Sequence, residues 1–280
     1  MSTRGEPATV SPSMLADLTT GAVEDAETRA SLRPLAAVEE AARAQTPALD
    51  ALTALAPSDR VKIIAEVKRA SPSRGDLAAI PDPAHQARLY EQGGAAVISV
   101  LTEGRRFKGS LEDLTAVRAA VGVPVLRKDF IATEYQVFEA RAGGADLVLL
   151  IVAALEQDRL AHLHALIVEL GMTPLVETHS VEEVDRAAAV GARLIGVNAR
   201  DLSTFDLDRD LFGRLAERIP AGAVKVAESA VLVPDDVARY RAAGADAVLV
   251  GEALVTSDPI TTLAAFLKAG ARVAQPGESK

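Results

Sequence analysis

The segment Glu66-Val67-Lys68 places an acid and a base two residues apart at the end of a short, β-branched run. On an extended chain, side chains at positions i and i+2 point to the same side, so the carboxylate and the ammonium should share one face. Charges at the end of a buried strand are costly unless they are paired or used. We therefore interpret Glu66 and Lys68 as part of a reactive site.

Charged or polar residues follow apolar runs in the same way further along the chain: Lys128 and Asp129, Glu177, Asn198 and Arg200, and Glu228 and Ser229. Two lysines and several carboxylates at one place can hold each other's pKa values in a range that suits general acid and base catalysis. A structural ring of ion pairs is the alternative, but such a ring gains little from Asn198 or Ser229. Asp129 alternates away from Lys128 and is interpreted as a brace for a loop or a helix cap, and His179 as a structural residue.

Two segments could hold a phosphate through backbone N–H groups at the start of a helix. They are Glu228-Ser229-Ala230-Val231 and Gly251-Glu252-Ala253-Leu254. Ser71 could close the site from the opposite side, whereas Ser73, followed by Arg74-Gly75, is typical of an ordinary turn.

A Gly-Ala pair followed by an apolar run recurs about every fifty residues, at Gly94, Gly144, Gly191 and Gly244. This period fits two strand-helix units, because one such unit takes about thirty residues or slightly fewer. The strands that follow the pairs are 96–101, 147–152, 194–198 and 247–251, and the intervening strands are 61–67, 123–127, 173–177 and 224–227. Amphipathic, alanine-rich segments lie between them, such as 111–121, 133–142, 158–170, 181–190 and 234–243.

Eight apolar strands alternating with helices predict an α/β protein with a closed (β/α)₈ TIM barrel. A doubly wound open sheet is the alternative, but it predicts a glycine-rich turn after the first strand, and Lys68-Arg69-Ala70-Ser71 is not one. Such a barrel places its reacting groups at the carboxyl ends of the strands, where the polar residues fall. We expect an N-terminal helical extension at 1–58, the catalytic barrel at 59–272 and a flexible tail at 273–280.

Composition limits the classes of function. The chain has 280 residues, 49% of them hydrophobic, with a net charge of −9, no cysteine and four histidines in no metal-ligand pattern. These features predict neither disulfides nor a metal site, and no nucleic-acid partner, since no basic stripe interleaved with aromatic residues is present. The sequence shows neither a run of eighteen apolar residues nor a secretory leader, so we expect no membrane partner and a cytoplasmic location.

The motifs at the strand ends carry a resemblance that covers roughly residues 60–270. They are Ile64-Ala-Glu66-Val-Lys68-Arg-Ala-Ser71-Pro-Ser73, Ser99-Val-Leu-Thr-Glu103, Arg127-Lys128-Asp-Phe130-Ile131, Leu175-Val-Glu177-Thr-His179, Ile195-Gly-Val-Asn198-Ala-Arg200-Asp-Leu202 and Val248-Leu-Val-Gly251-Glu252. In their order and combination they resemble the indole-3-glycerol phosphate synthase family. That family also has helices ahead of the first strand.

The resemblance implies that 1-(2-carboxyphenylamino)-1-deoxyribulose 5-phosphate closes a pyrrole ring with loss of carbon dioxide and water, without a metal or organic cofactor. Lys128 would be the acid at ring closure, and Glu177 would stabilise the cationic intermediate or move its proton. Lys68, paired with Glu66, would hold the substrate carboxylate and assist dehydration. The sequence leaves open how the two lysines divide these roles. Asn198 and Glu228 would orient the sugar and the lysines.

The same resemblance implies which residues bind the substrate. Arg200 would lie near the anthranilate carboxylate, Phe107 and Phe130 would flank the aromatic ring, and the phosphate would be surrounded by Ser71, Ser229, Gly251 and Glu252. Ordinary packing is an equal interpretation of the two phenylalanines. One residue departs from the family pattern, because Ala230 stands where a glycine is usual. If that position needs a positive φ, the extra Cβ costs about 1 kcal/mol and weakens phosphate binding.

Two other functions remain as alternatives. A phosphosugar isomerase barrel would share the phosphate site but would not need both Lys68 and Lys128. A diverged duplicate, serving secondary metabolism or binding only, would turn over no substrate or a different one. The expected partner is a small phosphorylated molecule. The sequence does not decide between a monomer and a chain that contacts other enzymes of the tryptophan pathway.

Overall fold

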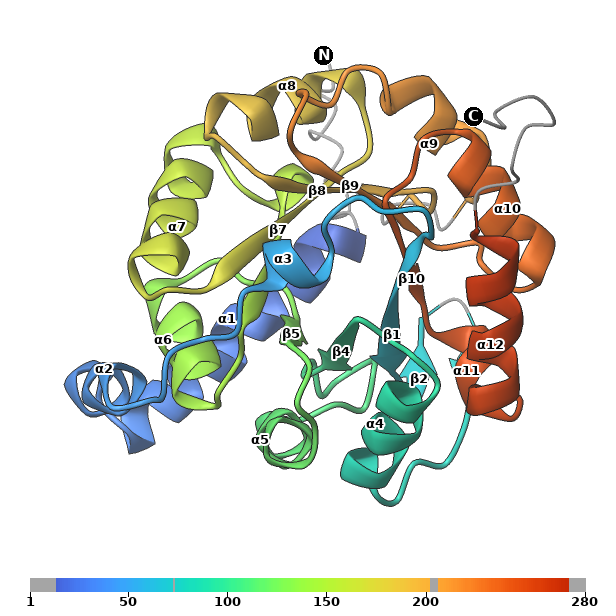
Figure 1. Ribbon diagram of the computed structural model, residues 1–280. Helices are drawn as coiled ribbons and strands as arrows, with labels where there is room; N and C mark the ends of the chain where they lie inside the picture. The colour runs from blue at the N-terminus through green and yellow to red at the C-terminus, as the bar shows by residue number, and fades with distance from the viewer. Residues whose placement is uncertain (1–13, 73, 202–205, 272–280) are drawn as a thin grey trace, which may run out of the picture.

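The computed structural model describes residues 14–72, 74–201 and 206–271. At its centre, eight parallel strands form a closed barrel (Figure 1). In barrel order the strands are β1 (Lys62–Val67), β4 (Val97–Leu101), β5 (Val125–Lys128), β6 (Leu147–Ile151), β7 (Thr173–Thr178), β8 (Leu194–Asn198), β9 (Val224–Glu228) and β10 (Ala247–Val250), which pairs with β1. The predicted (β/α)₈ barrel is confirmed.

Helices surround the barrel and cover the outward faces of its strands (Figure 1). They are α4 (Pro83–Gln92), α5 (Leu111–Ala120), α6 (Glu134–Ala142), α7 (Gln157–Glu169), α8 (Val181–Ala189), α9 (Leu211–Leu215), α10 (Pro234–Ala242), α11 (Glu252–Val255) and α12 (Pro259–Ala269), with a 3₁₀ turn, η1, at Val152–Ala154. Outward-facing strand residues such as Ile63, Val148 and Ile195 are fully buried beneath these helices. The core therefore has one apolar layer between the strands and the helices and a second inside the barrel.

Each Gly-Ala pair of the repeat ends a helix. Gly94, Gly144, Gly191 and Gly244 all have positive φ, between 75° and 93°. The N–H of the following alanine bonds back to a carbonyl near the helix end, as from Ala145 to Ala140 O at 2.9 Å. This arrangement is the Schellman motif, which ends a helix at a glycine in the left-handed region. The alanine is then buried as the next strand begins.

Side chains that point into the barrel are apolar in the lower layers and polar at the strand ends. Ile64, Leu126 and Leu175 belong to the interior apolar cluster. Two residues later, on the same face of each strand, come Glu66, Lys128 and Glu177. Because every second side chain of a strand points to the same face, the functional side chains lie directly above the apolar residues that fill the barrel.

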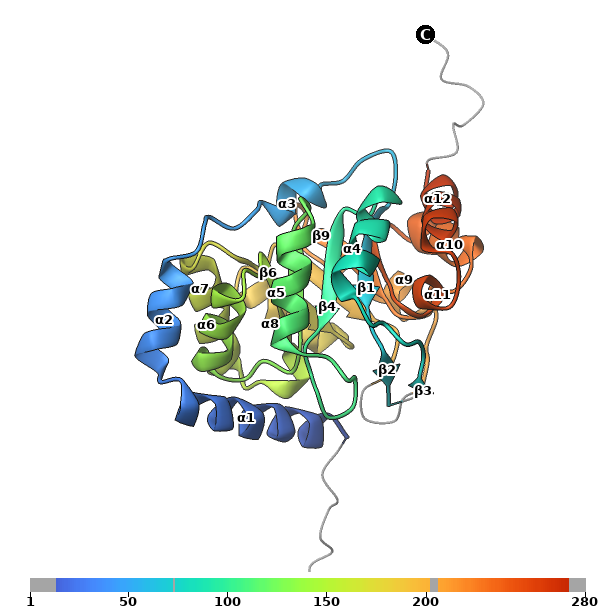
Figure 2. The ribbon, with the colours of Figure 1, turned by 90° about the horizontal axis from the view of Figure 1, so that it is seen from below.

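From residue 14 on, three helices precede β1: α1 (Met14–Leu32), α2 (Leu35–Arg43) and α3 (Ala51–Ala54). In Figure 2, α3 and α1 lie at opposite ends of the barrel. Ala51 and Leu55 pack into the interior cluster from one end, and Leu15 and Leu18 join it from the other. The proposed boundary near residue 58 falls between α3 and β1, and the proposed tail at 273–280 lies outside the described residues.

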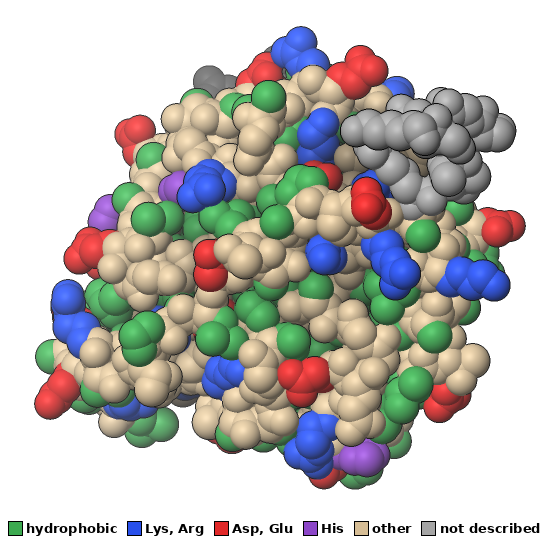
Figure 3. Space-filling model, viewed as in Figure 1, with side chains coloured by type: hydrophobic (Ala, Val, Ile, Leu, Met, Phe, Trp, Pro, Cys, Tyr) green, Lys and Arg blue, Asp and Glu red, His purple; other side chains and the backbone are tan. Residues whose placement is uncertain are grey.

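The segment after β1 forms a small antiparallel sheet, β2 (Ala70–Ser71) with β3 (Gly75–Asp76), at the same end of the barrel as α1 (Figure 2). This hairpin stands at the carboxyl ends of the strands, because it directly continues β1. The opposite face, which carries α3, shows Lys and Arg side chains interspersed with Asp and Glu (Figure 3).

Candidate active site

A cavity of about 210 Å³ opens at the carboxyl ends of the barrel strands. Every predicted site residue lines it: Glu66, Lys68, Ser71, Phe107, Lys128, Phe130, Glu177, Asn198, Arg200, Glu228, Ser229, Ala230, Gly251 and Glu252. They come from the ends of five strands and from the segments that follow six strands. The fold therefore collects into one cavity residues that are up to 186 positions apart between Glu66 and Glu252.

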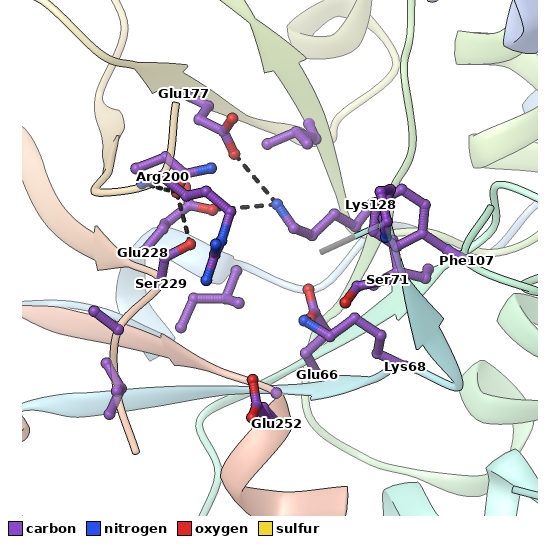
Figure 4. Close-up of a pocket in the computed structure, with 18 of the residues that line it drawn as sticks. Glu66, Lys68, Ser71, Phe107, Lys128, Glu177, Arg200, Glu228, Ser229 and Glu252 are labelled. Carbon is purple, nitrogen blue, oxygen red and sulfur yellow. Dashed lines mark hydrogen bonds and ion pairs between the residues drawn. The ribbon is translucent and has the colours of Figure 1, made fainter. Parts of the chain in front are cut away.

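Lys128 lies between two buried carboxylates (Figure 4). Its Nζ atom is 3.2 Å from Glu177 Oε2 and 3.2 Å from Glu228 Oε2, and both glutamates are only 1% exposed. Each of these carboxylates keeps a second oxygen, Oε1, that is buried and without a hydrogen-bond partner among the described residues. Glu177 Oε1 lies 3.5 Å from His179 Nε2, and Glu228 Oε1 lies beside Gly196 of β8. Unsatisfied buried oxygens cost free energy, so both carboxylates depend on the cations near them.

The three charges set each other's protonation. Burial alone would lower the pKa of Lys128, but the carboxylates of Glu228, Glu177 and Glu66 raise it above its usual value. Burial raises the pKa of Glu228 to about 8, against the opposing effect of Lys128. For Glu177, burial favours the neutral form, yet Lys128 and His179 hold its pKa below the usual value. Lys128 is thus a protonated donor, Glu177 an anion and Glu228 a carboxyl that can carry a proton near neutral pH.

A second ion pair stands across the cavity. Lys68 Nζ lies 2.6 Å from Glu66 Oε2, as expected from their shared face of the chain. Gly251 makes room for the pair, because an ideal Cβ there would lie 2.6 Å from Glu66 Oε2 and 3.0 Å from Lys68 Nζ. A side chain at position 251 would therefore disturb both charges.

Asn198 organises the loops after β8 and β9. Its Oδ1 accepts the Ser229 hydroxyl at 2.7 Å and the Arg200 backbone N–H at 3.0 Å. The Ser229 and Arg200 positions are thereby fixed relative to each other by one buried amide.

Ser229 and Ala230 both occupy the left-handed region, with φ of +69° and +58°. A non-glycine residue is disfavoured there by contact between its Cβ and the backbone. Ala230 therefore has the positive φ at which its Cβ is expected to cost free energy and to weaken phosphate binding. Successive backbone N–H groups in such a conformation form a concave surface that suits an anion.

The aromatic side of the cavity is built from Phe107 and Phe130, whose ring centroids are 6.1 Å apart. Phe130 is 6% exposed and lies in the interior cluster with Leu15 and Leu18 of α1. The Phe107 loop is shaped by the buried carboxylate of Glu103, which accepts the backbone N–H of Phe107 at 2.8 Å. Sequence reasoning gave Glu103 no role, although the residue falls at a strand end within a quoted motif.

Asp129 faces away from the cavity centre, as its alternation with Lys128 predicts. Its Oδ2 lies 2.9 Å from Arg127 Nη2 and accepts the Thr102 hydroxyl at 2.6 Å, while Oδ1 accepts the Phe130 backbone N–H. The fully buried Arg127 also lies 3.5 Å from Glu139 Oε2, and Arg29 of α1 binds Glu139 at 2.6 Å. This network braces the segment that carries Lys128 and Phe130.

Two further cations line the cavity without having been predicted, Arg74 and Arg209. Arg74 lies 3.1 Å from Glu252 Oε1, which joins the β2–β3 hairpin to the start of α11. Arg209 pairs with Asp236 at 2.9 Å. Arg74 follows the Ser71 segment directly, which could have drawn attention to it, whereas nothing in the local sequence marks Arg209. Ser73 lies outside the described residues.

Other observations concern metal and membrane. Within residues 14–72, 74–201 and 206–271, no group of three or more His, Asp or Glu side chains could hold a metal ion. In the same ranges, no helix is long and apolar enough to cross a membrane.

The residues that line the cavity favour acid and base chemistry on an anionic substrate, because they include paired cations, buried carboxylates and two aromatic rings.

Comparison with solved structures shows the same fold at low sequence identity. The chain matches an N-acetylmannosamine-6-phosphate 2-epimerase from Clostridium perfringens with a TM-score of 0.55 and 16% identity, over 71% of this chain and 90% of that one. It matches a thiamine phosphate pyrophosphorylase from Pyrococcus furiosus with a TM-score of 0.57 and 15% identity, over 75% of this chain and 95% of the other.

Comparison of sequences identifies much nearer relatives. The family model described as indole-3-glycerol phosphate synthase matches residues 14–266. The indole-3-glycerol phosphate synthase of Leifsonia xyli subsp. xyli is 73% identical over 253 residues, which are 90% of this chain and 97% of the relative. That of Mycobacteroides abscessus is 55% identical over 267 residues, 95% of this chain and 98% of the relative. This chain therefore belongs to the indole-3-glycerol phosphate synthase family.

Proposed function

We propose that the protein converts 1-(2-carboxyphenylamino)-1-deoxyribulose 5-phosphate to indole-3-glycerol phosphate, carbon dioxide and water. The observation that carries this proposal is the placement of Lys128 between Glu177 and Glu228, facing the Lys68 and Glu66 pair within one cavity. Ring closure needs a proton donor at a ketone, and dehydration needs a donor at a hydroxyl and an acceptor at a carbon. Two separately paired lysines can supply both donors.

In the first step, Lys128 hydrogen-bonds the ketone oxygen of the substrate. The aromatic carbon that bears the carboxylate attacks the carbonyl carbon, a C–C bond forms, and the oxygen takes a proton from Lys128. The raised pKa of Lys128 keeps this proton available. A developing alkoxide is a much stronger base than the neighbouring carboxylates, so transfer to it is favourable even from a weak acid.

Positive charge then resides on the substrate's nitrogen and ring, and Glu177 provides the compensating anion. The carboxylate leaves the ring carbon as carbon dioxide, and its electron pair restores the aromatic ring. In the last step Lys68 donates a proton to the hydroxyl, which leaves as water. The carbon next to the nitrogen loses its proton to Glu177 as the indole double bond forms.

Binding is assigned to the remaining residues. Arg200 and Lys68 attract the anthranilate carboxylate, and Phe107 and Phe130 contact its ring. The phosphate lies against Ser229, Ala230, Gly251 and Glu252, through the backbone N–H groups after β9 and β10, with Ser71 opposite. Asn198 supports this arrangement through its contacts with Ser229 and Arg200.

The test is direct, because the chain contains no tryptophan to mask the fluorescence of an indole product. The substrate is added to the purified protein and indole fluorescence is followed over time. A rise is expected, and Lys128→Ala should reduce turnover by a factor on the order of 10² or more. Near-normal kcat in that variant would remove Lys128 from the acid role.

An unchanged fluorescence signal with intact substrate binding would instead indicate a binding-only duplicate, and would contradict the proposed activity. We further propose that the protein works in the cytoplasm, in keeping with its biosynthetic family, and that it works as a monomer. Light scattering at assay concentration tests the monomer. A dimer would contradict it without affecting the chemistry.

A further inference from the structure

His179 lies beside the reaction centre, although the steps above do not use it. It follows β7 two residues after Glu177, and its side chain is only 14% exposed. Its Nε2 atom is 3.5 Å from Glu177 Oε1. Among the described residues, both of these buried atoms have no hydrogen-bond partner. Two unsatisfied atoms that face each other at this distance need only a small adjustment to form a hydrogen bond.

The other ring nitrogen is held from the opposite side by Glu183, in the first turn of α8. Glu183 Oε2 lies 3.1 Å from His179 Nδ1 and also accepts the His179 backbone N–H at 2.7 Å. The imidazole therefore has a carboxylate at each nitrogen. Only the doubly protonated ring can donate to both, because each neutral tautomer would turn one bare nitrogen toward a carboxylate oxygen.

These contacts continue into the catalytic group. Glu183, His179, Glu177 and Lys128 form a row in which negative and positive side chains alternate, and each carboxylate oxygen of Glu177 has its own cation. The charged groups that face His179 are Glu177 from β7, Glu183 from α8 and, at longer range, Glu228 from β9. Burial alone would lower the pKa of His179, but these three carboxylates raise it above its usual value.

We propose that His179, oriented by Glu183, is a positioning residue that keeps Glu177 ionised and turned toward Lys128. This inference rests on the proposed function, in which Glu177 must be the anion. Glu228, whose pKa is raised by burial, is the carboxyl that can carry a proton. Two carboxylates that share one lysine would otherwise compete for that proton. His179 is a second cation beside Glu177, so Glu177 stays ionised and the proton goes to Glu228.

The activity test compares His179→Ala, His179→Gln and the control His162→Ala, whose side chain is 52% exposed and contacts Glu134 on the surface. We expect His179→Ala to lower kcat about tenfold with little change in KM, as is typical when a residue that orients a functional side chain is removed. The acid limb of the pH profile of kcat should move to higher pH by about 1 to 3 units, since the pKa of Glu177 rises when a nearby cation is lost. Glutamine keeps an N–H donor without the charge, so it should recover much of the rate at neutral pH while the limb stays shifted.

A second readout does not depend on turnover. Nitrogen NMR of the histidine rings in the full-length protein, with His179 identified by its absence in His179→Gln, should show both ring nitrogens protonated at pH 7. Glu183→Gln should lower the pKa of this ring. A neutral His179 at pH 7, or an acid limb that does not move in His179→Ala, would overturn the inference. If the wild-type protein gives no indole product, the proposed function fails, whereas the NMR result still decides the charge of His179.

Discussion

The carboxylate of Glu228 occupies the space that a side chain at position 196 would need. An ideal Cβ on Gly196 would overlap Glu228 Oε1, because β8 and β9 are neighbours and both residues point into the barrel. The glycine in β8 thus allows Glu228 to reach Lys128. The strand sequence Leu194-Ile-Gly-Val-Asn198 combines a gap for its neighbour's side chain with a functional residue of its own.

Gly196→Ala should therefore displace Glu228 from Lys128. Misplacement of a catalytic group by about 1 Å can cost on the order of 10²-fold in rate, so we expect a loss of that size in kcat and a smaller change in KM. Steady-state kinetics provides the measurement. Gly213→Ala in α9 is the matched control, since its Cβ would meet its nearest neighbour at 3.8 Å. Equal kinetics in the two variants would contradict the steric account.

Ala230→Gly should stabilise the protein by about 1 kcal/mol, because glycine adopts the observed φ of +58° without the Cβ contact. If the same backbone holds the phosphate, KM should also fall several-fold. Urea unfolding and steady-state kinetics measure the two effects. Ala243→Gly, at a φ of −81° after α10, should destabilise instead. A destabilised Ala230→Gly would show that this turn is not strained.

Glu228 gives the folding stability a defined dependence on pH. Its pKa rises from 4.5 to about 8 on folding, so between these values the folded protein keeps a proton that the unfolded chain releases. Stability should therefore fall as pH rises through this window, by up to about 1.4 kcal/mol per pH unit for one proton. Glu228→Gln should remove this part of the decline.

The comparison uses urea unfolding of both proteins at pH 5 and pH 8. His179, whose pKa is also raised, loses its stabilising charge in part of the same window, but it does so in both proteins. Glu228 is the smallest of the contributions that raise the pKa of His179, so the difference between the two proteins reports mainly on Glu228 itself. Equal declines in the two proteins would mean that Glu228 is already ionised at pH 5.

The buried guanidinium of Arg127 should matter for stability far more than an exposed one. Arg127→Met leaves Asp129 and Glu139 buried with one cation fewer, and such a broken pair typically costs about 3–5 kcal/mol. Arg218 and Asp185 are more than half exposed and 3.3 Å apart, so Arg218→Met should cost less than about 1 kcal/mol. Chemical denaturation of both variants tests the contrast, which similar losses would contradict.

The barrel could be predicted from the sequence because its signals are local. An apolar run of five or six residues predicts a strand, and the Gly-Ala pair after Ala142 or Ala189 predicts the end of a helix. The β2–β3 hairpin gave no such signal, since strands of two residues carry no periodic pattern. The positive φ at Ser229 was also not evident, because serine does not mark the left-handed region as glycine does.

The sequence by itself determined which side chains stand at the strand ends, because alternation along a strand depends only on the pleat of the local backbone. Only the tertiary structure decided their partners. Lys128 meets Glu177 and Glu228 from β7 and β9, while Lys68 stays with Glu66. These pairings depend on the register and closure of strands far apart in the chain, which no local pattern encodes. The same closure buries the carboxylates, and burial is the largest effect on the pKa values of Glu177 and Glu228.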